Sequence, residues 1–388
     1  MKHEHTSERA AAPAGGDSTV PVPAVAGGGT GRRKSPGQRR GGNGSKRVEP
    51  SGAKDAAPDG LVIVDKPAGF TSHDVVAKMR GMARTRRVGH AGTLDPMATG
   101  VLVLGIERAT KLLGHLALTE KEYVGTIRLG QTTITDDAEG EITASKAAHG
   151  IAREDIDAGI AGLSGAIMQI PSKVSAIKID GKRSYSRVRD GEEVEIPARP
   201  VTVSSFVLHS AHETEAEDGT PVTDLLVSVE CSSGTYIRAL ARDLGEGLGV
   251  GGHLTALRRT RVGPYKLDRA RTLEQLQAAV DGGAGAEGAG GTGLPVMPIG
   301  DAAAAAFVRW DVTQAQARLL ANGVRIAMPL FDGTDSADGT NGTDSADGAG
   351  GGTGGRVGGP VAVFGPDGTF LALVENQGGK AKSLAVFV

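Results

Sequence analysis

The segment Gly89–Gly100, with the sequence GHAGTLDPMATG, contains the carboxylate of this chain that is best suited to chemistry. Asp95 is followed by proline, which restricts the backbone of the aspartate to extended or turn conformations. The glycines of the segment permit a positive φ and a close approach of the backbone. A carboxylate on such a stiff loop can act as a nucleophile or as a base, although an aspartate before proline is in general more often only a turn residue.

Arg238 is the candidate partner of Asp95. An unpaired charge in a closed site of low dielectric constant raises the pKa of its own carboxyl group, so an ionised aspartate there needs a counter-charge. A guanidinium stays protonated and can hold a carboxylate with two hydrogen bonds. Taken alone, Arg238 could equally be a surface residue in the first turn of a helix.

Short strands and amphipathic helices are expected around this loop. Leu61–Val64 is a short apolar run that predicts a strand, and Thr71 or Ser72 can cap the helix that follows. The run Val101–Leu104 predicts a second strand, followed by a helix around Ala109–Leu116. The loop with Asp95 therefore lies between two units in which a strand is followed by a helix.

The remainder of the chain mixes strands and helices in a pattern typical of an α+β domain with a largely antiparallel sheet. Alternating apolar and polar residues predict strands at Tyr123–Leu129 and Leu225–Cys231. Short helices are expected at Ala239–Leu248 and Leu254–Arg259, and hairpin turns are expected at Asp180-Gly181 and Asp190-Gly191. Near the C-terminus, strands are expected at Val324–Phe331 and Val361–Val374.

These motifs resemble those of the TruB family of bacterial tRNA pseudouridine synthases. The segment Gly89–Gly100 is similar to the signature loop of the family, whose aspartate is the essential catalytic residue. Other segments match family motifs in the same order, and the resemblance covers roughly residues 59–275. The matching segments are Val64–Pro67 with Thr71-Ser72, Lys121–Tyr123 with Arg128–Gly130, Gln169–Ser172 with Ser175–Lys178, Ser233–Arg238, and Leu257–Arg259.

The resemblance implies an isomerase that converts the uridine at position 55, in the TΨC loop of tRNA, to pseudouridine. The reaction breaks the glycosidic C–N bond, rotates the base and joins C5 to the sugar, so the base must first leave its stack. Asp95 would attack the base, attack the sugar or abstract a sugar proton, and these alternatives stay open. The implied fold is the pseudouridine-synthase fold with a mixed, mainly antiparallel sheet and a small β-rich PUA-like C-terminal domain that helps to hold the acceptor end of tRNA.

The resemblance also assigns roles to individual residues. Arg238 would pair with Asp95, and Tyr123 would stack on the flipped uracil. Tyr236 would lie near the base and help to transfer the C5 proton, and Leu257 would form an apolar wall of the pocket. Without the resemblance, these last three side chains could simply be core residues.

The other implied binding residues are further from the chemistry. His90 would fill the space that the flipped base vacates, Lys66 would support the catalytic loop, and Asp137 matches a polar position near the active site. Lys178 and Arg258 are expected to bind substrate. The candidates for contact with phosphate are Lys173, Lys178, Lys182, Arg183, Arg187, Arg258, Arg259 and Arg261.

The formal net charge of −2 conceals an uneven distribution. Residues 31–47 contain seven Lys/Arg and no acid, and residues 236–271 contain eight Lys/Arg against three Asp/Glu. Residues 332–388 contain seven Asp/Glu and three Lys/Arg. Screening confines each field to about 10 Å, so local basic patches decide contact with phosphate and the net charge is a poor guide.

Composition divides the chain into two domains and several low-complexity segments. We expect a disordered basic tail at 1–58, a catalytic domain at 59–300 with a Gly-rich insertion at 281–293, and a PUA-like domain at 301–388. The insertion at 332–359 contains the sequence GTDSADG twice. Its spaced aspartates lack the ligand spacing of an EF-hand loop, so we expect a flexible loop in preference to a calcium site.

Several classes of function are disfavoured by what the sequence lacks. Cys231 is the only cysteine, so neither an internal disulfide nor a zinc cluster of paired cysteines can form. We expect no metal, no cofactor and no membrane span, a cytoplasmic location, tRNA as partner, no required protein partner, and a monomer. The alternative functions are an RNA-binding or tRNA-folding protein without catalysis, and a related synthase that acts on another RNA.

Overall fold

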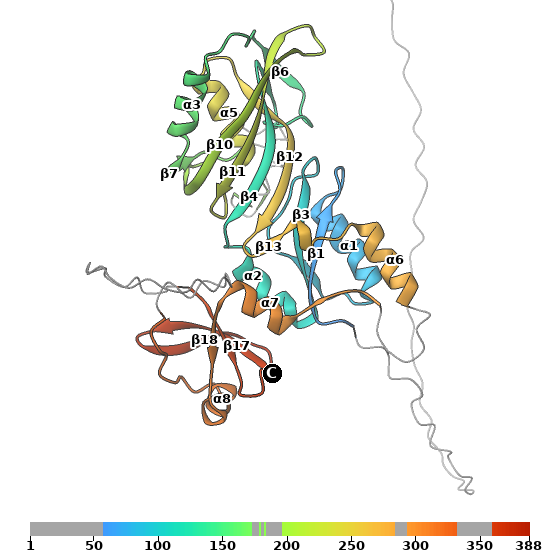
Figure 1. Cartoon of the computed structure of the whole chain (residues 1–388), viewed down its shortest axis with the longest axis vertical. Coiled ribbons are helices and arrows are strands. Elements are labelled where there is room, and N and C mark those ends of the chain that lie inside the picture. The colour runs from blue at the N-terminus through green and yellow to red at the C-terminus, as the bar shows by residue number, and fades with distance from the viewer. Residues whose placement is uncertain (1–56, 173–177, 180–181, 184–195, 284–292, 332–358) are drawn as a thin grey trace, which may run out of the picture. The chain divides into compact units, whose positions relative to one another are not determined.

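The computed structural model describes residues 57–172, 178–179, 182–183, 196–283, 293–331 and 359–388. The expected disordered tail and most of both low-complexity insertions lie outside these residues, as does the turn expected at Asp190-Gly191. The described residues form a mixed α+β fold, as the sequence predicted, with one large sheet and one small sheet (Figure 1).

The large sheet has ten strands in the order β14-β1-β3-β12-β4-β11-β10-β7, with β13 beside β12 and β2 beside β3. All of its pairings are antiparallel except that of β3 with β12. Its strands are β1 (Gly60–Lys66), β2 (Val88–His90), β3 (Thr99–Ile106), β4 (Lys121–Leu129), β7 (Gly165–Gln169), β10 (Arg199–Glu215), β11 (Pro221–Cys231), β12 (Gly252–Val262), β13 (Tyr265–Lys266) and β14 (Met297–Pro298).

The parallel pairing in the centre of the sheet places the end of the Asp95 loop against β12. Thr99 is opposite Arg258 and Gly100 is opposite Arg259. Gly100 has a φ of 102°, and a Cβ atom on it would lie 2.2 Å from the carbonyl oxygen of Arg259. Only glycine fits this close approach of two backbones.

Helices cover the faces of the large sheet. Helix α1 (Ser72–Met82) begins at Thr71 with a capping box formed with Asp74, and it lies beside α6 (Leu273–Gly283) next to β1 (Figure 1). Helices α3 (Arg153–Gly162) and α5 (Ile237–Gly247) pack together on another part of the sheet. The 3₁₀ helix η1 (Glu107–Leu112) leads into the short α2 (Leu113–Leu116) after β3.

The expected helix at Leu254–Arg259 is wrong, because these residues lie within β12. Strand β12 pairs with β4 over most of its length and with β3 at Arg258 and Arg259. Hydrogen bonds to neighbouring strands on both sides outweigh the modest helix propensity of a Leu/Ala/Arg sequence. The helix expected at Ala239–Leu248 is confirmed as α5.

The small sheet near the C-terminus has the order β15-β16-β17-β18 and is accompanied by two helices. Its elements are α7 (Ile299–Ala306), β15 (Val308–Asp311), α8 (Gln314–Ala321), β16 (Val361–Phe364), β17 (Phe370–Gln377) and β18 (Lys380–Val386). The strand expected at Val324–Phe331 is wrong, because this segment makes only one bridge, from Ala327 to Lys380. Pro329 in this run has no N–H group for a strand ladder.

Two small hairpins complete the described elements. Strand β5 (Gln131–Thr133) pairs with β6 (Ile142–Ser145), and the intervening loop contains Asp137. Strands β8 (Lys178–Ile179) and β9 (Lys182–Arg183) pair antiparallel on either side of the expected Asp180-Gly181 turn, which itself lies outside the described residues.

Candidate active site

Asp95 lies in the loop between β2 and β3, and the start of α1 holds this loop in place. The Leu94 amide donates a hydrogen bond of 2.9 Å to Ser72 Oγ, and Ser72 Oγ donates one of 3.2 Å to the Leu94 carbonyl. Ser72 is buried, so this contact is shielded from water. The residue before Asp95 is therefore fixed to the first turn of a capped helix.

The structure brings Arg238 against Asp95, although 143 positions separate them in the sequence. Arg238 Nε lies 3.0 Å from Asp95 Oδ2, and Arg238 Nη2 donates a hydrogen bond of 3.3 Å to Oδ1. The Arg238 side chain is 7% exposed and the Asp95 side chain 34% exposed. A buried guanidinium thus faces a carboxylate that remains accessible from the pocket.

Asp137 provides a second negative charge for the same guanidinium. Arg238 Nη1 lies 3.2 Å from Asp137 Oδ2 and donates a hydrogen bond of 2.8 Å to the Thr135 carbonyl. The Asp137 carboxylate also accepts hydrogen bonds from the Thr135 hydroxyl and the Glu139 amide. The loop between β5 and β6 therefore fixes Arg238 from the side opposite to Asp95.

Asp95 and Arg238 line a pocket of about 280 Å³, close to the lower end of the range for small-molecule sites. Tyr123, Tyr236 and Leu257 line the same pocket, so all four expected catalytic residues and the expected apolar wall are brought together. The remaining lining residues are Gly92, Thr93, Leu94, Ala117, Lys121, Ser233, Gly234, Thr235, Ile237 and Arg259.

The two tyrosines enter the pocket from different elements. Tyr123 projects from β4, and its burial raises the pKa of its hydroxyl group. Tyr236 is the residue before α5, and the buried Gln169 side chain bonds to both its amide (2.8 Å) and its carbonyl (3.1 Å). Gln169 belongs to one of the segments that match a family motif, and its side chain is part of the scaffold that positions Tyr236.

Two buried cations hold the backbone on either side of Asp95. Lys66 is fully buried, and its Nζ donates hydrogen bonds to the carbonyls of Pro67 (2.9 Å), Phe70 (2.6 Å) and Pro96 (3.1 Å). Burial lowers the pKa of Lys66 to about 8, although the nearby Asp95 opposes this shift. The expected supporting role of Lys66 thus has a structural basis in its contact with the carbonyl that follows Asp95.

Arg259 is the second of these cations, and sequence reasoning misjudged it as a phosphate ligand. Its side chain is 1% exposed and donates to the carbonyls of Val101 (2.7 Å), Thr93 (3.3 Å) and Gly92 (3.3 Å). The first of these carbonyls belongs to β3 and the other two to the Asp95 loop. Arg259 is therefore a structural clamp of the loop.

Lys121 is a pocket residue that sequence reasoning missed. Its Nζ donates to the carbonyls of Ala117 (2.9 Å) and Thr119 (2.7 Å), and burial lowers its pKa to about 8. A signal was present, because residues two apart on a strand share a face and Lys121 precedes Tyr123 by two positions.

His90, Arg258 and Arg261 are absent from the lining of the pocket. His90 ends β2, its ring meets the His73 ring edge-on at 5.6 Å, and burial lowers the pKa of its imidazole, which keeps it mainly neutral at pH 7. Arg258 pairs with Asp65 at 2.7 Å and lies on the strand that carries Leu257. Arg261 is engaged by Glu122 and Glu230, which opposes its expected contact with phosphate.

The remaining expected ligands are described only in part. Lys178 lies in β8, and Lys182 and Arg183 lie in β9, while Lys173 and Arg187 are outside the described residues. In the part of the chain that the structure describes, no three His, Cys, Asp or Glu side chains are grouped so as to hold a metal ion. Within that part, no helix is long and apolar enough to cross a membrane.

Three family models match this chain. Residues 80–237 match the N-terminal domain of the TruB family of pseudouridylate synthases. Residues 238–285 match the C-terminal domain of tRNA pseudouridylate synthase B, and residues 355–388 match the C-terminal model of tRNA pseudouridine synthase II. The first match contains the Asp95 loop and ends one residue before Arg238.

Proteins called tRNA pseudouridine synthase B are similar to this chain over most of their length. The one from Streptomyces griseus is 68% identical over 330 residues, which is 85% of this chain and 97% of the relative. The one from Thermobifida fusca is 50% identical over 329 residues, which is 85% of this chain and 98% of the relative.

Solved structures of a Cbf5-Nop10-Gar1 complex and of an H/ACA RNP bound to a substrate RNA contain chains with a similar fold. The first has a TM-score of 0.59 at 24% identity and covers 86% of this chain and 85% of that chain. The second has a TM-score of 0.57 at 22% identity and covers 86% of both.

Proposed function

We propose that this chain, which belongs to the TruB family of pseudouridylate synthases, isomerises the uridine at position 55 in the TΨC loop of tRNA. It is a tRNA pseudouridine synthase, as its close similarity to the synthases of Streptomyces griseus and an Arthrobacter species indicates. The position of the uridine and the roles of the residues below are the proposal.

The observation that supports these roles best is the set of side chains that line the pocket. A carboxylate held by a buried arginine, two tyrosines and an apolar wall enclose about 280 Å³. Such a space suits a single flipped pyrimidine and is too small for a folded RNA element. The substrate must therefore present one base that has left its stack, which costs a few kcal/mol.

In the proposed site, Tyr123 stacks on the uracil and Leu257 closes the pocket behind it. Arg238 orients Asp95, because its guanidinium contacts both oxygens of the carboxylate, at 3.0 Å and 3.3 Å. Asp95 then attacks the base or the sugar, or abstracts a sugar proton, so that the bond from C1′ to N1 breaks. After the base rotates, C1′ joins C5 and any bond formed to Asp95 is released. Tyr236 assists the loss of the C5 proton, and N1 gains a proton, so that the product is an isomer of the substrate.

His90 takes part in opening the RNA rather than in the chemistry. It lies two residues before Gly92 of the pocket lining and ends the strand that leads into the Asp95 loop. An imidazole that is neutral at pH 7 carries a smaller desolvation cost than an imidazolium when it enters the base stack. We assign it to the space that the flipped base vacates.

The domain organisation follows from the same proposal. Residues 59–300 form the catalytic domain, and residues 301–388 form a PUA-like domain that holds the acceptor end of the tRNA. The enzyme acts alone, as a monomer in the cytoplasm. Gel filtration with light scattering tests the monomer, and a stable dimer at assay concentrations would contradict it.

The test of the function is carbodiimide mapping of unmodified tRNA treated with wild-type protein or with Asp95→Asn. The isosteric amide keeps the shape of the pocket but removes the charge. A single new stop in the TΨC loop with wild type alone supports the proposed position and the role of Asp95. A stop at another position refutes the proposed site, and binding of tRNA by both proteins without any stop refutes the enzymatic function.

A further inference from the structure

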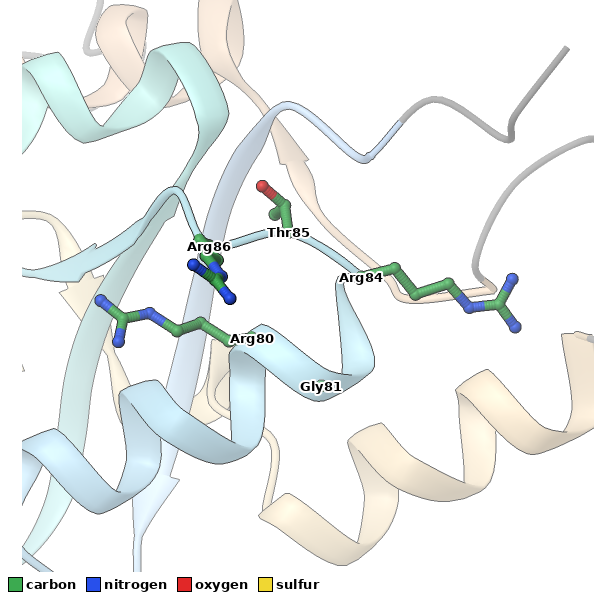
Figure 2. Close-up of a pocket in the computed structure, with 5 residues that line it drawn as sticks. All are labelled: Arg80, Gly81, Arg84, Thr85 and Arg86. Atoms are coloured by element: carbon green, nitrogen blue, oxygen red, sulfur yellow. The ribbon is translucent and has the colours of Figure 1, made fainter. Parts of the chain in front are cut away.

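A cluster of arginines lies in the last turn of α1 and in the segment that follows it, and the sequence analysis did not predict a role for it. Residues 77–88 contain five Lys/Arg and no acid. Arg80, Arg84 and Arg86, together with Gly81 and Thr85, line an open hollow of about 650 Å³ (Figure 2). All three arginines are exposed. We call this surface the arginine hollow.

Two of these guanidinium groups lie on the same side of the turn. Figure 2 shows Arg80 and Arg86 pointing to the same side of the turn, whereas Arg84 extends to the opposite side. The Arg80 side chain donates to the Val88 carbonyl at 3.4 Å. Among the described residues, neither Arg80 nor Arg86 has a carboxylate within ion-pair distance. Two like charges brought together without an acid repel each other, and a bound anion relieves that repulsion.

The turn that carries Arg86 is held in a defined conformation. Arg84 has a φ of 53°, which ends α1 in the left-handed region. The Thr85 hydroxyl bonds to the Glu107 carboxylate, the Glu107 amide donates to the Arg87 carbonyl at 2.9 Å, and Arg87 pairs with Glu107 at 3.4 Å. Glu107 therefore neutralises Arg87 and fixes the turn, but it leaves the Arg86 guanidinium in the hollow.

The arginine hollow lies at a fixed distance from the proposed active site. Ser72, at the start of α1, is bonded to Leu94 of the Asp95 loop, and Arg80 is eight residues further along the same helix. Eight residues of α-helix correspond to about 12 Å. That distance equals three to four steps of about 3.4 Å along a nucleic-acid strand. An RNA stem attached to a nucleotide in the pocket can therefore extend to the hollow.

We propose that Arg80 and Arg86, on one side of the arginine hollow, bind the phosphodiester backbone of tRNA a few nucleotides from the flipped base. This inference rests on the proposed function, because it takes the tRNA as the occupant. Arginine suits the site, since its planar fork can form two hydrogen bonds with one phosphate. Contacts with the backbone fix the register and orientation of the RNA and carry no sequence information.

A purely structural role accounts for only part of the cluster. Arg80 lies in the last turn of α1, where a positive charge stabilises the helix through its dipole. This explanation does not apply to Arg86, which follows the helix. The variant Arg86→Gln therefore tests the hollow without altering the helix, and Arg84→Gln is its matched control, with the same loss of charge two residues away.

The experiment measures the affinity of an unmodified tRNA transcript for each variant by fluorescence anisotropy over a series of salt concentrations. Each phosphate contact contributes a slope of about −0.7 to −0.9 to the plot of log K against log salt. Arg86→Gln should lower the magnitude of the slope by about 1, and Arg80→Gln/Arg86→Gln by up to about 2. The enzyme concentration that gives half-maximal single-turnover pseudouridine formation should rise in both variants in proportion to the loss of affinity.

Two results would overturn the proposal. One is a slope for Arg80→Gln/Arg86→Gln equal to that of wild type, and the other is an equal loss of slope in Arg84→Gln and Arg86→Gln. The assay of pseudouridine on the same transcript keeps this test separate from that of the function. If wild type modifies the tRNA but the slopes do not change, only the hollow fails, and if wild type forms no pseudouridine, the proposed function fails.

Discussion

Replacing Arg259 by methionine should weaken both the fold and the catalytic step. The Arg259 guanidinium donates to two carbonyls of the Asp95 loop, Thr93 (3.3 Å) and Gly92 (3.3 Å), and to the Val101 carbonyl of β3 (2.7 Å). Its side chain is 1% exposed. Methionine has nearly the length of the aliphatic part of arginine but no donor. The substitution thus removes the clamp and keeps most of the packing.

The expected loss of stability follows from these three contacts. A hydrogen bond from a charged donor contributes about 1.5–3 kcal/mol, and two of the three are long, so we take the lower limit for each. The free energy of unfolding should then fall by about 4.5 kcal/mol. The free energy of unfolding of a typical domain is about 5–15 kcal/mol, so the variant should still fold at low temperature.

The loss of activity should exceed what the loss of folded protein explains. The loop carries Asp95 two residues after Thr93, and a displacement of about 1 Å at a reacting group can cost about 100-fold in rate. We expect kcat to fall by about 100-fold. KM for tRNA should change little, because the Arg259 side chain is buried and its donors face backbone carbonyls of the protein. Arg259→Lys should recover part of kcat, since an ammonium can still donate to one or two of the carbonyls.

Urea unfolding and steady-state kinetics on a tRNA transcript measure these effects. Arg258→Met serves as the stability control, because the neighbouring Arg258 side chain is 42% exposed and pairs with Asp65 at the surface. Such a pair contributes about 0–1 kcal/mol. An Arg259→Met protein with wild-type unfolding midpoint and a kcat within about twofold of wild type would refute the clamp, since about 100-fold is expected.

Three further predictions concern the same site. Gly100→Ala should prevent stable folding or lower the free energy of unfolding by about 3 kcal/mol or more, because its Cβ would lie 2.2 Å from the Arg259 carbonyl oxygen. Gly69→Ala is the control, since no atom lies within 4 Å of its new Cβ, and backbone strain should lower the free energy of unfolding by only about 1–2 kcal/mol. Urea unfolding measures both losses. Asp137→Asn should lower the single-turnover rate by about tenfold with little change in tRNA affinity, because Arg238 loses one of its two carboxylate partners. An unchanged rate would show that Asp95 alone positions Arg238. Burial lowers the pKa of Lys121 to about 8 from 10.5, so between these pH values the unfolded state binds more protons and the free energy of unfolding rises with pH. Urea unfolding of Lys121→Met should lack this rise of stability with pH. Equal pH slopes in the variant and in wild type would contradict the prediction.

The sequence predicted which residues line the pocket better than it predicted the secondary structure around them. Asp95, Tyr123, Tyr236, Arg238 and Leu257 were all expected near one base, and all five line one pocket. For Tyr123, Tyr236 and Leu257 this expectation came from the resemblance of their motifs to those of the TruB family, because the residues alone could equally belong to the core.

The errors came from residues whose partners are distant in the chain. Leu254–Arg259 has a composition compatible with a helix, yet pairing with β4 and β3 makes it a strand. Arg259 and Arg261 were expected to meet phosphate, but burial and acidic neighbours engage them inside the protein. A basic side chain in a sequence does not reveal whether its partner is solvent, a carbonyl or a carboxylate.

By itself, the sequence determined the carboxylate, its stiff loop and the set of motifs that accompany it. The tertiary structure alone decided that Arg238 is held between Asp95 and Asp137, and that Lys66 and Arg259 hold the backbone on either side of Asp95. These contacts join residues from β1, β12, α5 and two loops, and they depend on the order and register of the strands. The physical reason is that desolvation and hydrogen bonding depend on distances in space, which the spacing of residues along the chain does not specify.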